Sequence, residues 1–185
     1  WLYDPGTAAS YWYSEAEKEF LLERYSELET PFSIDYAQGW IQAAGSAGVV
    51  IKYGMILLGF LLAGIFSDEF QWKAEPVYYS SRHGRGKGTR AKLAAGLLLT
   101  TLVYVLCVSA YSLAVLGSLG TDGANCPVQS AIGDWKSMYN LTFSEKYFRI
   151  LGLGYIGYLF FGMLVMWISA KANSPVLAVM IPSLA

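Results

Sequence analysis

The chain has 185 residues, of which 55% are hydrophobic and only 15% are charged, and its formal net charge is −1. Soluble domains carry about a quarter charged residues, so this composition argues against an ordinary soluble enzyme. The apolar residues gather in long runs, and residues 93–121 and 150–170 contain no charge at all. Because about 18 apolar residues suffice to cross the hydrocarbon core as a helix, the sequence predicts an all-α, polytopic helical membrane protein.

Residues 1–42 form a polar, aromatic and acidic segment, with eight Asp or Glu against Lys18 and Arg24. Ser14 and Glu17 have the spacing of a capping box, which predicts a helix from there to Glu29 that ends before Pro31. We expect this segment to be an extracellular helical region.

The remainder, residues 43–185, reads as a transmembrane domain. Its spanning helices are expected at about 43–66, 93–120 and 147–170, followed by a fourth apolar segment, 176–185, that is cut short. Lys52 is expected about two turns inside the first helix, where its ammonium can snorkel towards the interface. The chain begins with Trp1 and stops within an apolar stretch, so we expect an internal piece of a longer protein that has further helices.

The distribution of Lys and Arg predicts the sidedness of the loops. The 67–92 loop holds six of these residues, and the short turn 171–175 holds Lys171. Since cytoplasmic loops collect Lys and Arg, both are predicted to be cytoplasmic. Residues 1–42 and the 121–146 loop are then extracellular, where we expect them to pack together as a small helical cap. The predicted location is the plasma membrane, with several crossings.

The basic loop contains a glycine-rich stretch, HGRGKGT (83–89), that only partly resembles a phosphate-binding loop. Lys87 is followed by Gly88 instead of Ser or Thr, and no strand leads into it. Bases beside a membrane helix are expected for topology, so no nucleic-acid partner is predicted. The cysteine and histidine spacing favours neither a metal site nor a cofactor, and no catalytic group is evident.

The loop itself is patterned. Ser67 can cap a short helix whose first turn carries Asp68 and Glu69, where carboxylates are favoured. Aromatic residues follow, so the segment reads as an amphipathic stretch along the membrane with side chains available for a partner. The alternative is an interfacial helix that only anchors the loop.

Three stretches of the chain carry a family resemblance: IFSDEF (65–70), YSSRHGR (79–85) and AKLAAG (91–96). They are similar to permease subunits of type-2 ABC transporters, in which a Phe-Ser-x-Glu element, an amphipathic coupling segment and a basic helix start follow one another. Where that family more commonly has Gly-Thr, this chain has KAEP (73–76), so the resemblance identifies no substrate.

The resemblance implies a non-catalytic permease that forms a substrate path with a second permease half. A separate ATP-binding cassette subunit would hydrolyse ATP and contact the 67–92 loop. The residues implied in that contact are Glu69, Phe70, Tyr78 and Tyr79. Those expected to fix topology or meet lipid headgroups are Arg82, Arg85, Lys87, Arg90 and Lys92.

Two other functions are consistent with a polytopic chain. A membrane sensor or assembly protein would use an extracellular ligand-binding region and would not need the patterned loop. An intramembrane enzyme would need polar catalytic residues at depth, and the centres of the second and third apolar runs hold no charged residue.

Overall fold

The computed structural model describes residues 12–28, 30, 32–73, 84–131, 133–134 and 136–171, and the side chains of 69–71, 84 and 85 are not part of that description. Regular structure in these residues is helical, apart from one isolated bridge between Pro127 and Thr142. The predicted residues Tyr78, Tyr79 and Arg82 lie outside the described residues, as does the apolar segment 176–185.

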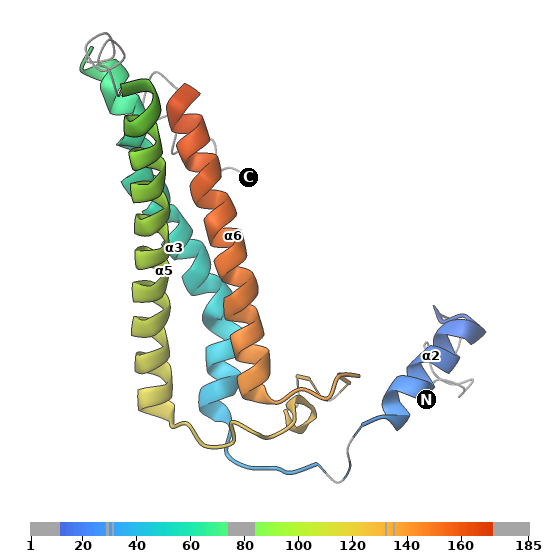
Figure 1. Cartoon of the computed structure of the whole chain (residues 1–185). Coiled ribbons are helices and arrows are strands. Elements are labelled where there is room, and N and C mark those ends of the chain that lie inside the picture. Colours follow the sequence, from blue (N-terminus) through green and yellow to red (C-terminus); the bar gives the residue numbers. More distant parts are fainter. Residues whose placement is uncertain are drawn as a thin grey trace.

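Three long helices stand side by side: α3 (Gln38–Gln71), α5 (Thr89–Leu119) and α6 (Phe143–Lys171). In Figure 1 α3 and α6 run in the same direction and α5 runs against them. The candidate membrane spans have 31 residues in α3, 34 from Gly86 through α5 and 29 in α6, more than the roughly 20 that cross a bilayer. The chain is therefore an all-α membrane protein with at least three helices able to span, as predicted.

The two ends of this bundle differ in character. We call the end where α3 ends, α5 begins and α6 ends the basic end, because Lys87, Arg90, Lys92 and Lys171 lie there. The opposite end, at Gln38, is called the cap end. A short π-helix, η1 (Gly84–Gly88), leads into α5 and contains the glycines of the 83–89 stretch.

All three spanning helices begin earlier than the charge pattern predicts. They start at Gln38, Thr89 and Phe143, instead of near residues 43, 93 and 147. Packing extends α3, since Trp40 is buried and its indole N–H donates to the Thr121 carbonyl at 2.9 Å. The predicted starts assume that each helix begins where its apolar run begins. Helices continue beyond the hydrocarbon, however, and Gln, Arg, Lys and Glu are good helix formers.

The earlier start of α3 changes the position of Lys52 along the helix. Fourteen residues separate Gln38 from Lys52, which is about 21 Å of helix. The distance of about two turns given above is therefore wrong, and Lys52 lies near the middle of the apolar span. Its side chain is exposed on the bundle surface.

Helix α2 (Glu15–Ser26) stands apart from the bundle, to the side of the cap end (Figure 1). The predicted capping box is confirmed: the Glu17 amide donates to Ser14 Oγ at 3.3 Å, and the Ser14 amide donates to Glu17 Oε2 at 2.8 Å. The hydrogen bonds from the Ser14 backbone and hydroxyl hold the pKa of Glu17 below its usual value. The carboxylate that completes the box is thus ionised at neutral pH.

Helix α2 contacts the loop between α5 and α6, which contains a short 3-10 helix, η2 (Val128–Ser130). The Tyr25 hydroxyl donates to the Lys136 carbonyl at 2.8 Å, and the Asn140 amide donates to the Glu27 carbonyl at 2.9 Å. Burial raises the pKa of Tyr25, which keeps its phenol protonated as a donor. The described parts of segments 1–42 and 121–146 are therefore in contact, but α2 lies to the side of the bundle and does not cover its end.

Hydroxyl groups join the helices inside the bundle. Three tyrosines each donate to a backbone carbonyl of a neighbouring helix: Tyr104 to Leu151 and Tyr158 to Gly54 at 2.6 Å, and Tyr111 to Ala43 at 3.1 Å. In hydrocarbon such bonds are worth about 0.6 kcal/mol each, because the separated helices also find partners. These hydrogen bonds fix how the helices are aligned with one another along their axes.

Candidate functional site

Two of the three stretches that carry the family resemblance, 65–70 and 91–96, meet at the basic end. Lys92, at the start of α5, donates from Nζ to the Ile65 carbonyl of α3 at 3.0 Å. The same ammonium lies 5.3 Å from the centre of the Phe66 ring, within range of a cation–π contact. Lys92 is one of the five residues predicted to fix topology or meet headgroups. Among those whose contacts the structure describes, it is the one that contacts α3.

Gly96, one turn further along α5, lets the helices approach closely. A Cβ at this position would clash with Met166 Sδ of α6 and would lie 3.2 Å from Ile65 Cδ1 of α3. Lys92 and Gly96, both within the 91–96 stretch, thus bring α5 against residues 65–66. The two outer stretches of the resemblance form one structural junction.

Ser169 of α6 adds a polar contact to this junction. Its hydroxyl donates to the Ala63 carbonyl at 2.6 Å, and the amides of Phe66 and Ser67 lie 3.2 Å from the same oxygen. Ser67 Oγ also donates to the Ala63 carbonyl at 2.6 Å, and both serine side chains are fully buried. We name this contact between Ala63–Ser67 and Ser169 the serine lock. The sequence does not predict this contact, because it does not show which neighbouring helix a serine within an apolar run faces.

The predicted capping role of Ser67 is wrong. α3 continues without interruption to Gln71, so Ser67 lies inside the helix and bonds to the carbonyl four residues earlier. Asp68 and Glu69 therefore lie in the last turns of α3, where the helix dipole disfavours carboxylates, and not in a first turn. The helix ends at Gln71, and a turn follows at Trp72 and Lys73. Lys73 has a φ of 50°, the left-handed conformation common after helix ends.

The other predicted residues divide between two elements. Glu69 and Phe70 belong to the end of α3, while Arg85 and Lys87 belong to η1. The side chains of Lys87 and Arg90 are exposed. Glu69 and Phe70 thus precede segment 74–83, and Arg85 and Lys87 follow it.

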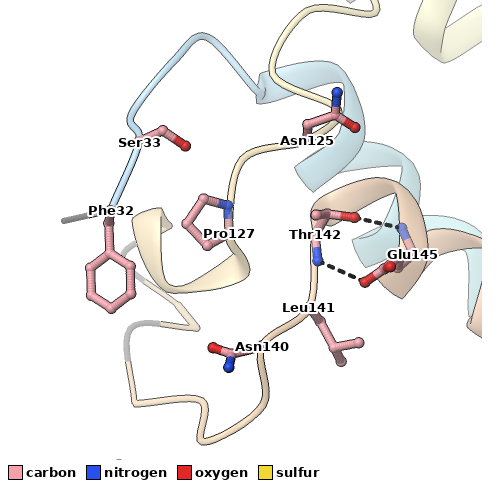
Figure 2. Close-up of a pocket in the computed structure, with 8 residues that line it drawn as sticks. All are labelled: Phe32, Ser33, Asn125, Pro127, Asn140, Leu141, Thr142 and Glu145. Carbon is pink, nitrogen blue, oxygen red and sulfur yellow. Dashed lines mark hydrogen bonds between the residues drawn. The ribbon is translucent and has the colours of Figure 1, made fainter. Parts of the chain in front are cut away.

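A second candidate site is a pocket of about 270 Å³ at the cap end (Figure 2). Three separate segments line it, and their polar residues are Ser33, Asn125, Asn140, Thr142 and Glu145. Phe32, Pro127 and Leu141 supply apolar surface. Amide, hydroxyl and carboxylate groups beside apolar faces suit a small polar molecule. No sequence motif predicts this pocket, because its residues come together only in the fold.

Two of these pocket residues also cap α6. The Glu145 amide donates to Thr142 Oγ1 and the Thr142 amide donates to Glu145 Oε2, both at 3.2 Å, as the dashed lines in Figure 2 mark. This reciprocal pair is a capping box. It explains why α6 begins at Phe143, four residues before the predicted start.

Replacing Thr142 by alanine is expected to loosen the first turn of α6. The loss of the cap should lower stability by about 1 kcal/mol and speed amide hydrogen exchange at residues 143–146. Thr142→Ser keeps the hydroxyl and serves as the control. Equal exchange rates in the two variants would contradict a capping role for Thr142.

The described residues contain no group of three His, Cys, Asp or Glu side chains placed to hold a metal ion. Cys107 and Cys126 are both free thiols, one in α5 and one in the α5–α6 loop. Comparison of the chain with protein-family models, with curated proteins and with solved structures found no match.

Proposed function

We propose that the chain is a membrane-spanning permease subunit of an ATP-driven ABC transporter of type 2. It would form part of a substrate path and couple to a separate ATP-binding subunit through the 67–92 loop. The observation that carries the proposal is the junction at the basic end. There the 65–70 and 91–96 stretches, which suggested the family, lie against each other and against α6.

The junction gives a physical route for coupling. The loop follows the end of α3 and enters α5 through η1. About two turns from the end of α3 and from the start of α5, the hydrogen bond of Lys92 and the close approach at Gly96 hold the two helices together. A partner that moves the loop would therefore move the ends of α3 and α5 together. The serine lock would carry the same displacement to α6, as rigid packed helices do in switching proteins.

The proposed orientation places the basic end in the cytoplasm and the cap end outside. The five described cations of the 67–92 loop, together with Lys171, lie at the basic end and support it. The permease itself would perform no chemistry, and ATP hydrolysis would belong to the partner. The proposed location is the plasma membrane.

The exposed face of α3 around Lys52 supports a second permease half. Gly45 and Gly48 lie on this face, and a Cβ at either position would meet nothing within 4 Å. Small residues allow another helix to approach closely in lipid, and an ionisable side chain at depth commonly marks a path or a partner. In the proposal this face points to the second half or to the substrate path.

The test of coupling uses Phe70, in the last turn of α3. Phe70→Ala should reduce co-purification of the ATP-binding subunit about thirtyfold, because a buried aromatic anchor contributes about 2 kcal/mol to an interface. Membrane insertion should be unchanged. Tyr139→Ala removes an exposed aromatic side chain at the cap end, far from the loop, and is the control.

Tyr78→Ala and Glu69→Ala extend the same test to the other implied contacts. Coupled ATP hydrolysis is measured for each variant beside the co-purification. If all three variants retain both the subunit and its coupled ATPase activity, the loop is only an anchor and the coupling assignment is wrong.

A membrane sensor or assembly protein is the second candidate function, and the pocket of Figure 2 is the observation that favours it. Such a protein would bind a small polar ligand at the cap end and would purify without an ATPase. Thermal unfolding of the purified chain across a set of sugars, amino acids and amines tests this function. A stabilising ligand whose effect disappears in Asn125→Ala, together with no ATPase partner, would favour the sensor over the permease.

A further inference from the structure

An apolar groove opens on the bundle surface at the basic end, between α5 and α6. Its volume is about 410 Å³. Thr89, Leu93 and Leu97 line it from α5, and α3 contributes Phe66. From α6 the lining residues are Met163, Met166, Trp167 and Ala170. Thr89 is the one lining side chain that carries a polar group, so the groove suits hydrocarbon.

The groove has the length of an acyl chain segment within one leaflet. Thr89 and Leu97 are eight residues apart on α5, which corresponds to about 12 Å along the helix axis. One leaflet contributes about 15 Å to the hydrocarbon thickness. Phe66 and Met166 form a buried floor, whereas Trp167 and Met163 are more than half exposed and form one wall. The groove is therefore open to lipid and runs along the leaflet.

Positive charge surrounds the mouth of the groove. Lys171 Nζ lies 4.7 Å from the centre of the Trp167 ring, so a cation–π contact holds the ammonium against the groove wall. Lys92 Nζ lies 5.3 Å from the ring of Phe66, which forms part of the floor. Arg90, next to Thr89, is exposed. Two ammonium groups thus contact aromatic rings of the groove itself.

The local charge balance favours an anionic occupant. The described residues at this end include two acidic residues, Asp68 and Glu69, and six basic ones: Lys73, Arg85, Lys87, Arg90, Lys92 and Lys171. Basic pockets between membrane helices bind phosphate-bearing headgroups. We propose that this groove is a binding site for an anionic phospholipid, with one acyl chain between α5 and α6 and the phosphate between Lys171 and Arg90. This site does not depend on the transporter proposal and holds for either orientation.

The site can be tested by quenching of tryptophan fluorescence with brominated lipids in the intact chain. The protein is placed in phosphatidylcholine nanodiscs that contain a minor fraction of phosphatidylglycerol, with bromine on the acyl chains of one lipid or the other. The contribution of Trp167 is the difference between the wild type and Trp167→Phe. We expect brominated phosphatidylglycerol to quench this contribution about tenfold more effectively per molecule than brominated phosphatidylcholine, given two cations at the headgroup.

Charge variants separate this site from general attraction to a basic surface. The double variant Lys171→Gln with Arg90→Gln should lose the preference for phosphatidylglycerol while Trp167 remains quenched by both lipids. Lys87→Gln removes an exposed cation of the same end, in η1, and should keep the preference. An equal loss in Lys87→Gln would overturn the proposal, because the preference would then belong to the surface.

Two further results would also overturn it. Equal quenching of Trp167 by both lipids in the wild type would mean that the groove holds acyl chains without selecting a headgroup. No quenching by either lipid would mean that protein fills the groove, and the apolar residues that follow Lys171 would be the first candidate. Native mass spectrometry gives an independent readout, since a bound phosphatidylglycerol should survive detergent exchange in the wild type and be lost from the double variant.

Discussion

Replacing Gly96 by leucine is expected to force α5 away from α3 and α6 at the basic end. A Cβ at Gly96 already clashes with Met166 Sδ and would lie 3.2 Å from Ile65 Cδ1, and Met166 is itself buried, so a leucine side chain enters only if both neighbours move. Overpacking of this kind lowers stability by about 1–3 kcal/mol. For a chain of this size it should lower the midpoint of thermal unfolding in detergent by about 2–9 °C.

Gly117→Leu is the matched control for this variant. Gly117 lies on the same helix, and a Cβ there would meet nothing within 4 Å. Leucine is the better helix former, so Gly117→Leu should leave the midpoint unchanged or raise it slightly. If both variants unfold at the same temperature, close approach at Gly96 does not hold the junction together.

Gly96→Leu also bears on the proposed coupling. Displacement of α5 should break the hydrogen bond from Lys92 to the Ile65 carbonyl, so the ends of α3 and α5 would no longer move as a unit. The variant should therefore retain the ATP-binding subunit but lose transport-coupled ATP hydrolysis. This outcome differs from that of Phe70→Ala, which should lose the subunit itself.

The fold class was predictable because it follows from uncharged apolar runs, whose length decides whether a helix can span. The helix starts were not predictable from charge alone. The position of Trp40 depends on a hydrogen bond to Thr121, which is 81 residues away in the chain, and the start of α6 depends on the cap between Thr142 and Glu145. The first contact is part of the tertiary structure and the second is a local cap, and a hydropathy pattern reveals neither.

The candidate site was predictable only in part. The resemblance indicated residues 65–70 and 91–96, and the structure places them in contact. The direction of Ser67 was predicted incorrectly, because a serine can cap a helix or bond back to the carbonyl four residues earlier, and sequence does not distinguish these states. Ser169 was not identified at all, since its role depends on which face of α6 meets α3.

Truncation of Tyr158 to alanine is expected to destabilise the bundle more than any surface change. Its side chain is 1% exposed, it donates to the Gly54 carbonyl at 2.6 Å, and its ring contacts that of Tyr104 at 5.1 Å between centres. Removing a buried aromatic ring from a packed core costs about 3–5 kcal/mol. In lipid the transfer contribution is smaller, since separated helices also face hydrocarbon, so a loss near the lower bound is expected.

Two variants separate the packing of Tyr158 from its hydrogen bond. Tyr158→Phe keeps the ring and loses only the bond to Gly54, so it should lower stability by about 0.6 kcal/mol. Tyr53→Ala removes an exposed tyrosine from the neighbouring turn of α3 and should change stability by no more than about 0.5 kcal/mol. Unfolding in a denaturing detergent gives all three values. We expect Tyr158→Ala to be the more damaging variant, because a void leaves the side chains that line it without dispersion contacts. If Tyr158→Phe were as damaging as Tyr158→Ala, the hydrogen bond and not the packed ring would hold α6 to α3.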